Sequence, residues 1–315
     1  MYNSTLKETY IAQQYDNIKT IQNVKRVFDA TEVYEAKYNC DISQMNDDQA
    51  DETIRGVCGI KSATIDATLA YIRMYIRWRS DVCKDATTDA FFKVVTPSIE
   101  IIKSRSVSGP VDLSIYLDTI FDSKAEDHKP DNVYRCYMWL AFMGFEENES
   151  HEMTVKNVDL QTMEVNFNGR CVPIYREAFP VFRNVVLLDH FIYENSNYGD
   201  SIIRERLPGE SLFRGVRSSC PTVLTLRAEI NRQIDNTVSR LGDGVRRVTY
   251  ARALQSGIFY RFYELERAGI EIDFKKFCEG ADRPHRDKPV KDRKTLNNFV
   301  RDMKKDYEAW KLAFV

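Results

Sequence analysis

The sequence predicts a mainly α-helical protein with one small antiparallel β-sheet, divided into two domains. Apolar residues recur at helical spacing over most of the 315 residues. One stretch, 163–175, instead alternates as strands do, around an Asn168-Gly169 turn signal. A segment rich in Ser, Gly and Pro, 103–110, separates two helical regions, so we place the domain boundary near residue 109.

The first hundred residues predict helices. Apolar spacing predicts one helix over 6–28, and a second begins near Asp47 after an acidic loop. Ser62 is a favourable N-cap for a helix over 62–78. The apolar stripe of that helix consists of Ile65, Leu69, Ile72 and Ile76. A further helix is predicted over 90–102, with a break at Pro97.

After the boundary, helices are predicted over 113–121 and 131–145. The periodicity then changes at the 163–175 hairpin. Helical patterns resume to the C-terminus, with breaks rich in Gly and Asn near 195–200 and 242–244. These patterns confine the predicted sheet to the middle of the chain.

Composition excludes several classes of protein. Hydrophobic residues make up 43% and charged residues 29%, a mixture that can build packed cores. No run of 18 apolar residues occurs, and the N-terminus lacks the apolar segment of a signal peptide. Seven scattered cysteines without a CxxC pair and four separated histidines argue against a disulfide framework and a metal centre. We therefore expect a cytoplasmic protein that has no metal, no cofactor and no membrane partner.

The formal net charge of -2 conceals an uneven distribution. Basic residues exceed acidic ones in 200–315, whereas 1–199 is acidic. The densest basic stretch is 283–305 and includes Lys291, Arg293 and Lys294. A basic face on an otherwise acidic protein can hold a polyanion locally, and the alternative is a solvated helix surface.

Several short motifs, taken in order, resemble the tyrosine recombinase (phage integrase) family. Residues 61–78 are similar to its core-binding helix. Trp139-Leu-Ala-Phe-Met-Gly-Phe-Glu-Glu-Asn-Glu, followed by Val155-Lys-Asn-Val-Asp, is similar to its first box. The 163–173 hairpin matches the sheet after that box, and Val248-Thr-Tyr-Ala-Arg-Ala-Leu falls at the family's His-x-Leu-Arg box. The resemblance implies a helical, SAM-like core-binding domain over 1–109 and a degenerate integrase catalytic-like domain over 110–315.

The catalytic residues of that family are largely replaced. The family activates a DNA phosphate with two arginines, a strand lysine and His or Trp donors, and a tyrosine then attacks phosphorus. Glu146 stands at the first arginine, where its charge would repel the developing dianion. Thr249 stands at the histidine and cannot act as a general acid at neutral pH. Arg252 matches the second arginine, and Arg170 lies near the lysine position.

The whole chain is similar to the integrase-like lytic-cycle repressors of SPβ-type Bacillus phages. The resemblance implies specific binding of double-stranded operator DNA that represses transcription and maintains lysogeny, without strand cleavage. A helix start can meet phosphates through backbone N–H groups and side chains, as expected at Lys61, Ser62 and Thr64. The candidate DNA-binding residues are Lys61, Ser62, Thr64, Arg73, Arg77, Arg170, Arg246, Arg247, Arg252, Lys291, Arg293 and Lys294. Each of them has the alternative of being solvated or paired within the fold.

Two other functions stay open. An active but divergent tyrosine recombinase would use Tyr307 as nucleophile and Arg252 as a phosphate clamp. A helical interaction protein would instead bind an acidic protein through its basic C-terminal region. Homo-oligomerisation and a regulatory partner from the phage or the host also stay open.

Overall fold

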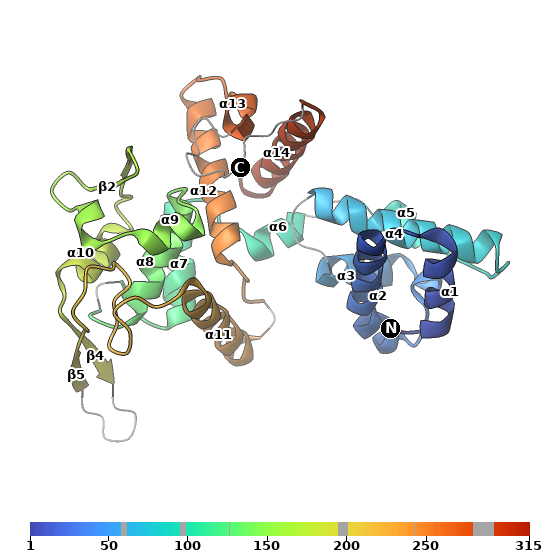
Figure 1. Cartoon of the computed structure of the whole chain (residues 1–315), viewed down its shortest axis with the longest axis horizontal. Coiled ribbons are helices and arrows are strands. Elements are labelled where there is room, and N and C mark those ends of the chain that lie inside the picture. Colours follow the sequence, from blue (N-terminus) through green and yellow to red (C-terminus); the bar gives the residue numbers. More distant parts are fainter. Residues whose placement is uncertain (58–61, 95–98, 126, 195–200, 243, 280–292) are drawn as a thin grey trace. The chain divides into compact units, whose positions relative to one another are not determined.

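The structure is a computed structural model that describes residues 1–57, 62–94, 99–125, 127–194, 201–242, 244–279 and 293–315 (Figure 1). The chain forms two compact units. The first comprises Met1–Ile102 and Arg301–Ala309, and the second Lys103–Val300 and Trp310–Val315. The prediction of a mainly helical chain with a small antiparallel sheet is confirmed. Each helix that the structure describes falls short of the length and apolarity needed to cross a membrane.

Among its described residues, the first unit contains helices and no strand. Its elements are α1 (Ser4–Gln14), α2 (Ile18–Tyr38), η1 (Ile42–Gln44), α3 (Asp47–Val57), α4 (Ser62–Asp81), α5 (Ala90–Lys93) and most of α6 (Ile99–Arg105). The start near Asp47 is confirmed. A break between α5 and α6 also agrees with the prediction, although Pro97 itself lies outside the described residues.

The single helix predicted over 6–28 is wrong. The chain leaves the helical conformation at 15–17 and starts again as α2. The Asn17 side chain accepts hydrogen bonds from the backbone N–H groups of Lys19 at 3.0 Å and Thr20 at 3.1 Å. These bonds satisfy donors that a helix start leaves unpaired, so Asn17 begins a new helix inside an amphipathic pattern.

The core of the first unit forms around α4. The predicted stripe of Ile65, Leu69, Ile72 and Ile76 is buried, which confirms the helical assignment. Aromatic rings from three helices continue this core, with Tyr75 lying 5.3 Å from Tyr10 and 5.1 Å from Phe28 between ring centroids. Both pairs are edge-to-face, an arrangement that aromatic quadrupoles favour.

An ion pair is also buried in this core. Lys7 Nζ lies 2.7 Å from Glu35 Oε1, and neither side chain is exposed to solvent. Glu35 also accepts hydrogen bonds from the backbone N–H of Ile42 at 3.0 Å and from the Thr31 hydroxyl at 3.1 Å. Burial raises the pKa of Glu35, and the charge of Lys7 opposes that rise. The pair therefore has the extra hydrogen bonds that a buried carboxylate needs.

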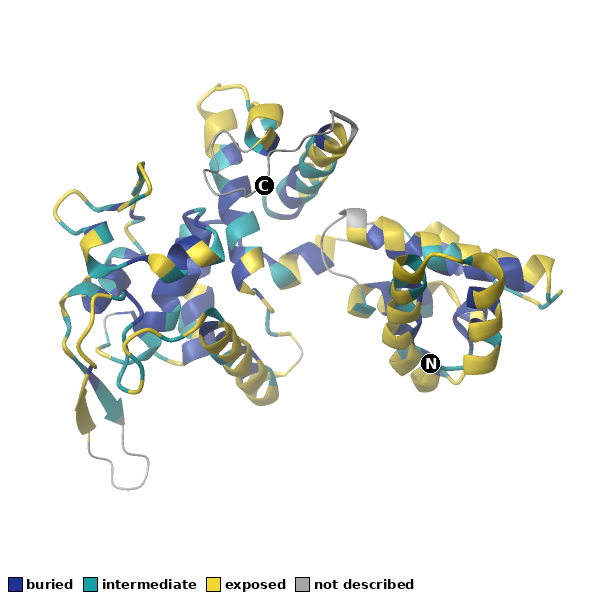
Figure 2. Cartoon of the chain, in the orientation of Figure 1, coloured by how far each residue is buried: buried dark blue, intermediate teal, exposed yellow. Residues whose placement is uncertain are grey.

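The second unit contains the remaining elements. Its helices are α7 (Pro110–Phe121), α8 (Asp131–Phe142), α9 (Glu147–Glu152), η2 (Val155–Asn157), α10 (Phe179–Leu187), α11 (Val223–Leu241), α12 (Tyr250–Arg267), α13 (Phe274–Glu279) and the ends of α14 (Arg293–Phe314). The helix α8 is the centre of this unit, and ten of its residues are buried (Figure 2). The helix α12 packs closely on it, because a Cβ on Gly257 would lie 1.8 Å from the carbonyl oxygen of Phe142.

The predicted hairpin is confirmed as part of a three-stranded antiparallel sheet. The strands are β1 (Val158–Asp159), β2 (Glu164–Phe167) and β3 (Arg170–Pro173), in the order β1-β2-β3. Phe167 pairs with Arg170 across the turn. The two turn residues have positive φ, 49° at Asn168 and 76° at Gly169, as the tight hairpin turn requires.

A second hairpin replaces the helical pattern predicted after residue 175. The strands β4 (His190–Glu194) and β5 (Ser201–Glu205) pair antiparallel. Both carry β-branched or aromatic residues that favour strands, and both are only five residues long. A short apolar run of this kind fits a strand or part of a helix equally well by periodicity.

The segment 103–110 is not the exposed linker that its composition suggested. Ser106 and Val107 are buried. The backbone N–H of Val107 donates to the Ser256 hydroxyl at 3.2 Å, and its carbonyl accepts from Trp310 Nε1 at 3.1 Å. The start of the second unit is therefore hydrogen-bonded to buried residues of the same unit.

Candidate functional site

The predicted site residues do not form one cluster. Lys61 and Lys291 lie outside the described residues, as do the side chains of Ser62, Arg293 and Lys294. Thr64 is exposed in the first turns of α4. The other candidates divide between arginines that hold the fold together and arginines that line a cavity.

Arg73 and Arg77 on α4 lie close to one aromatic ring. Their guanidinium groups are 5.8 Å and 5.3 Å from the ring centroid of Phe92 on α5. Arg73 Nε also donates to the carbonyl of Phe91 at 2.9 Å, so Arg73 connects the two helices. Arg77 is exposed, and its charge lies at the surface of the first unit.

Arg170, a DNA-binding candidate on the predicted hairpin, is paired within the fold. Its side chain is only 19% exposed and pairs with the buried Glu149 at 3.2 Å. The guanidinium also donates to the carbonyl of Gly144 at 3.2 Å and lies 4.5 Å from the Phe145 ring centroid. In the acidic stretch 146–149, Glu149 is therefore buried in a structural ion pair.

Arg246 is held by a carboxylate from a distant part of the chain. Its two terminal nitrogens donate to Asp112 on α7 at 2.8 Å and 2.7 Å. Burial alone would raise the pKa of Asp112, but Arg246 and hydrogen bonds from Ser108 hold that pKa below its usual range. The pair connects the segment before α12 to the start of α7.

Three arginines from separate segments converge on a cavity of about 480 Å³ in the second unit. Arg105 comes from the end of α6, Arg247 from the loop before α12, and Arg252 from the first turn of α12. The backbone N–H of Arg247 donates to the carbonyl of Ser104 at 2.8 Å, which holds two of these segments side by side. The other described lining residues are Asn231, Ile234, Asp235 and Thr249. We call this space the arginine cavity.

The charges around this cavity favour an anion. Among the described lining residues, Asp235 is the one carboxylate, and it accepts a hydrogen bond from Arg247 at 2.8 Å. Arg252 donates to the side-chain oxygen of Gln255 at 2.9 Å. With three guanidinium groups against one carboxylate, the lining carries a positive balance.

The start of α12 adds to this positive balance. Thr249 is the N-cap of this 18-residue helix and lines the cavity, and its side chain makes no capping hydrogen bond. The N-terminus of a helix carries a partial positive charge from its aligned peptide dipoles. The cavity therefore combines side-chain cations with a helix N-terminus, a combination that suits a phosphate or another oxyanion.

A smaller cavity of about 280 Å³ adjoins the first and shares Asn231 and Thr249 with it. It contains Arg227 of α11, whose guanidinium pairs with Glu147 of α9. Glu147 also accepts a hydrogen bond from the hydroxyl of Tyr137. The exposed face of α11 thus places another arginine beside the arginine cavity.

Sequence analysis found Arg247 and Arg252 but missed Arg105. Arg105 lies in the basic string Lys103-Ser-Arg105, and the composition of the segment 103–110 indicated a linker. Arg105 reaches the cavity because this segment is packed into the second unit, and periodicity does not reveal such packing.

The replaced catalytic positions have structural roles. The Glu146 side chain caps the start of α9, and its backbone N–H donates to Glu149 at 2.7 Å. Thr249 begins α12, as described above. Tyr307, the nucleophile of the alternative function, is 1% exposed. Among the described residues, no group of three His, Cys, Asp or Glu side chains is arranged to hold a metal ion.

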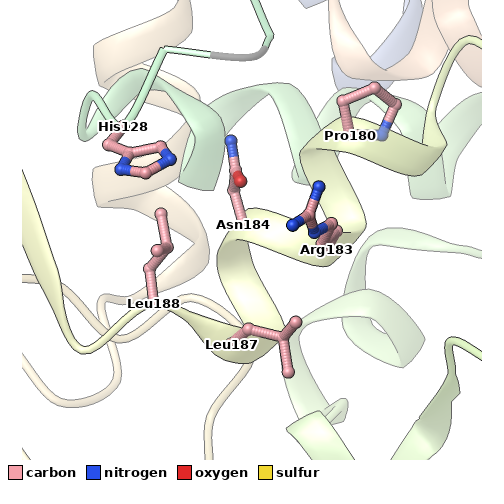
Figure 3. Close-up of a pocket in the computed structure, with 6 residues that line it drawn as sticks. All are labelled: His128, Pro180, Arg183, Asn184, Leu187 and Leu188. Carbon is pink, nitrogen blue, oxygen red and sulfur yellow. The ribbon is translucent and has the colours of Figure 1, made fainter.

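A further cavity of about 190 Å³ lies beside α10 (Figure 3). His128 and Asn184 face one another across it, and Arg183 lies nearby on the same helix as Asn184. Asn184 Nδ2 donates to the carbonyl of Ala125 at 2.8 Å. The volume is below the usual range of ligand pockets, so we assign no function to it.

Comparisons with known proteins comprise a family model that matches the N-terminal helices and solved structures that are similar over most of the chain. The family model of the MrpR N-terminal core-binding domain matches residues 1–81, which span α1 to α4. The comparison with curated proteins found no match. Among solved structures, XerA recombinase is similar at 13% identity over 86% of each chain, with a TM-score of 0.34. The Tn1549 transposon integrase in complex with circular intermediate DNA is similar at 13% identity over 94% of each chain, with a TM-score of 0.38.

Proposed function

We propose that this protein is a sequence-specific repressor that binds double-stranded operator DNA, maintains phage lysogeny and does not cleave DNA. The arginine cavity carries this proposal. Arg105, Arg247 and Arg252 surround one space at the N-terminus of α12. A backbone phosphate is the DNA group that such a set of donors recognises.

The N-terminal unit supports the same function. Residues 1–81 match a core-binding domain model, and Arg77 on α4 presents an exposed guanidinium. Phosphate contacts fix the register of a protein on duplex DNA, whereas base-edge contacts supply sequence specificity. We therefore assign the arginine cavity to positioning on the DNA backbone rather than to reading of bases.

The absence of cleavage is supported by two replaced positions and by the burial of Tyr307. Glu146 brings negative charge where a developing dianion needs cations, and Thr249 supplies no general acid near neutral pH. Tyr307 is buried, so its hydroxyl is not presented to an external phosphorus atom. A protein with these features would cover DNA without forming a covalent intermediate.

The test mixes the full-length protein with fragmented DNA of its source genome and divides the retained complexes into native and SDS-treated halves. We expect retention of a few fragments at moderate salt and release of all of them by SDS. Equal retention of random DNA would overturn specific binding. An adduct that survives SDS and disappears in Tyr307→Phe would instead establish the divergent recombinase. A stable complex with an acidic protein, without DNA retention, would favour the helical interaction protein.

A further inference from the structure

Another cavity, also of about 480 Å³, lies in the second unit. Its lining residues differ from those of the arginine cavity. Its walls come from four segments: the first turn of α8, the β4–β5 hairpin, the loop 213–221 and the helix α11. The volume is within the roughly 300–1,000 Å³ that is typical of sites for small ligands. The proposed DNA function makes no use of this cavity.

The bottom of the cavity is apolar. Phe191, Phe213 and Val133 line it and are almost completely buried. Tyr134 and Tyr193 line it as partly buried rings. Side chains alternate along a strand, so Phe191 and Tyr193 lie on the same face of the hairpin. The lining therefore offers an aromatic surface to an apolar ligand group.

Charged groups of opposite sign reach the cavity from different elements. Asp131 on α8 and Glu229 on α11 supply carboxylates. Glu229 is already neutralised, because it accepts hydrogen bonds from Arg232 Nε at 2.9 Å and from Gln233 at 2.9 Å. Asp131 accepts a hydrogen bond from the Ser123 hydroxyl at 3.3 Å, and burial raises its pKa despite the charge of Arg135. Asp131 is therefore the carboxylate that a cationic ligand group would stabilise most.

The positive groups lie on the hairpin and the loop. Arg204 on β5 is paired with Phe191 in the strand register, and its guanidinium lies 5.4 Å from the ring centroid of Tyr193. Arg217 is an exposed residue of the loop and also lines the cavity. The cavity thus has a negative group on its helical side and two positive groups on its hairpin and loop side.

A buried arginine fastens the hairpin to its surroundings. Arg206 follows β5 and is 6% exposed. Its Nη1 donates to the carbonyls of Val185 and Leu188, both at 2.8 Å, and its Nε donates to the carbonyl of Arg214 at 3.0 Å. The loop is tied further by Leu207 N–H donating to the carbonyl of Gly215 at 2.8 Å. These bonds hold the walls in place, as expected of a largely preformed ligand site.

We propose that this cavity binds a small zwitterion with an apolar side group, either an amino acid or a short peptide. Its ammonium group pairs with Asp131, its carboxylate pairs with Arg204 and Arg217, and its apolar group packs on the partly exposed rings of Tyr134 and Tyr193. A ligand of a single charge would leave the opposite charge of the site desolvated and without a partner. A zwitterion provides a partner for the carboxylate and for the guanidinium groups of the site, and its apolar group covers aromatic surface.

The experiment titrates the full-length protein, in the absence of DNA, with L-phenylalanine and with the dipeptide Phe-Leu by calorimetry. N-acetylated and C-amidated forms of each serve as matched probes. We expect binding of at least one free zwitterion and a loss of affinity of about tenfold or more when either terminus is blocked, because each block removes a charged hydrogen-bonding group. Tighter binding of the dipeptide than of the amino acid identifies a peptide site, and the reverse order identifies an amino acid site.

Two variants test the assigned ends separately. In Arg217→Gln, we expect the free and C-amidated probes to bind with more similar affinities, while discrimination against the N-acetylated probe persists. In Asp131→Asn, we expect the opposite pattern. Arg183→Gln, at an exposed arginine outside this cavity, is the control and should retain full discrimination.

The proposal is overturned if none of the free probes binds at millimolar concentration, or if inorganic phosphate binds equally well. It is also overturned if Arg217→Gln, a substitution of an exposed side chain, leaves discrimination between the free and amidated carboxylate unchanged. Because all titrations are done without DNA, these results are independent of whether the protein binds an operator.

Discussion

Arg105 and Arg252 reach one cavity from α6 and α12, and each should contribute a charged hydrogen bond to a DNA phosphate. We expect Arg252→Ala and Arg105→Ala each to weaken operator binding by about 10–100-fold, in line with about 1.5–3 kcal/mol for such a bond. The slope of log affinity against log salt should fall by about 0.9 for each phosphate that the variant no longer neutralises. Fluorescence anisotropy over a salt series measures both quantities.

The control for these variants is Arg183→Ala, an exposed arginine on α10 outside the arginine cavity. Its affinity and salt slope should equal those of the unmodified protein. If Arg105→Ala and Arg252→Ala behave like this control, the arginine cavity does not hold a phosphate.

The buried pair of Lys7 and Glu35 gives a second prediction at the scale of residues. Lys7→Met leaves the Glu35 carboxylate buried without its cation, and we expect a loss of about 3–5 kcal/mol in the free energy of unfolding. The double variant Lys7→Met, Glu35→Leu should recover most of that loss, because no charge remains buried. Urea unfolding followed by circular dichroism measures both. A single variant as stable as the unmodified protein would contradict this account.

The sequence identified candidate DNA-binding arginines, but it did not reveal which of them pair with carboxylates inside the fold. Arg246 was a DNA candidate, yet it pairs with Asp112, which lies 134 positions away in the chain. Arg170 likewise pairs with Glu149 across the fold. No local pattern reveals such distant partners. Arg252 was recognised as a candidate because it lies in a motif with neighbours at fixed positions.

At the scale of elements, the packing of α12 on α8 depends on a residue without a side chain. A Cβ at position 257 would lie 1.8 Å from a backbone oxygen of Phe142, and backbone atoms cannot move aside cheaply. We expect Gly257→Ala to lower the free energy of unfolding by about 1–3 kcal/mol or more, since overpacking forces the helices apart. Gly244→Ala is the matched control, because a Cβ there meets open space. Equal stability of the two variants would show that the helices do not pack this closely.

The connection between α7 and the segment before α12 should depend on pH. The folded protein holds the pKa of Asp112 below its usual range, so this carboxylate contributes stability above its unfolded pKa of about 3.9. That contribution disappears as the pH falls through the lower, folded pKa. The difference in unfolding free energy between the protein and Asp112→Asn should therefore be constant from about pH 5 to pH 7 and shrink below about pH 4. A difference that grows on acidification would contradict the pairing with Arg246.

Long, strongly periodic elements were the predictable ones. The stripe of α4 and the Asn168-Gly169 turn each have a sequence signal that matches one structure. The strands β4 and β5 escaped prediction because five-residue segments with only two or three apolar residues do not distinguish strand from helix. The interruption at 15–17 escaped because the capping by Asn17 lies inside a continuous amphipathic pattern.

At the scale of the whole molecule, two of the hydrophobic clusters that the described residues form share no residue. One contains buried residues from Tyr10 to Phe91, and the other from Val107 to Ala253. Since the first cluster lies within the N-terminal part of the chain, we expect the fragment 1–94 to fold alone and to unfold cooperatively. Circular dichroism during thermal unfolding tests this. A broad, non-cooperative loss of helix would show that this core needs the rest of the chain.

Whole-molecule properties gave little direct information on the site. A net charge of -2 does not reveal a cavity with three arginines, because the cavity forms only when α6, the loop before α12 and α12 itself come together. The charge asymmetry along the chain correctly indicated the basic region 200–315, which contains Arg247 and Arg252. The packing of 103–110 into the second unit then added Arg105, which charge counting placed elsewhere.

The chain has three tryptophans, all buried, and their distribution allows the fluorescence of each unit to be recorded separately. Trp78 lies in the first unit, whereas Trp139 and Trp310 lie in the second. A protein with Trp139→Phe and Trp310→Phe therefore emits tryptophan fluorescence from the first unit only, and Trp78→Phe confines the emission to the second. Natural fluorophores thus allow the response of either half to DNA, to a zwitterion or to denaturant to be recorded without an attached dye.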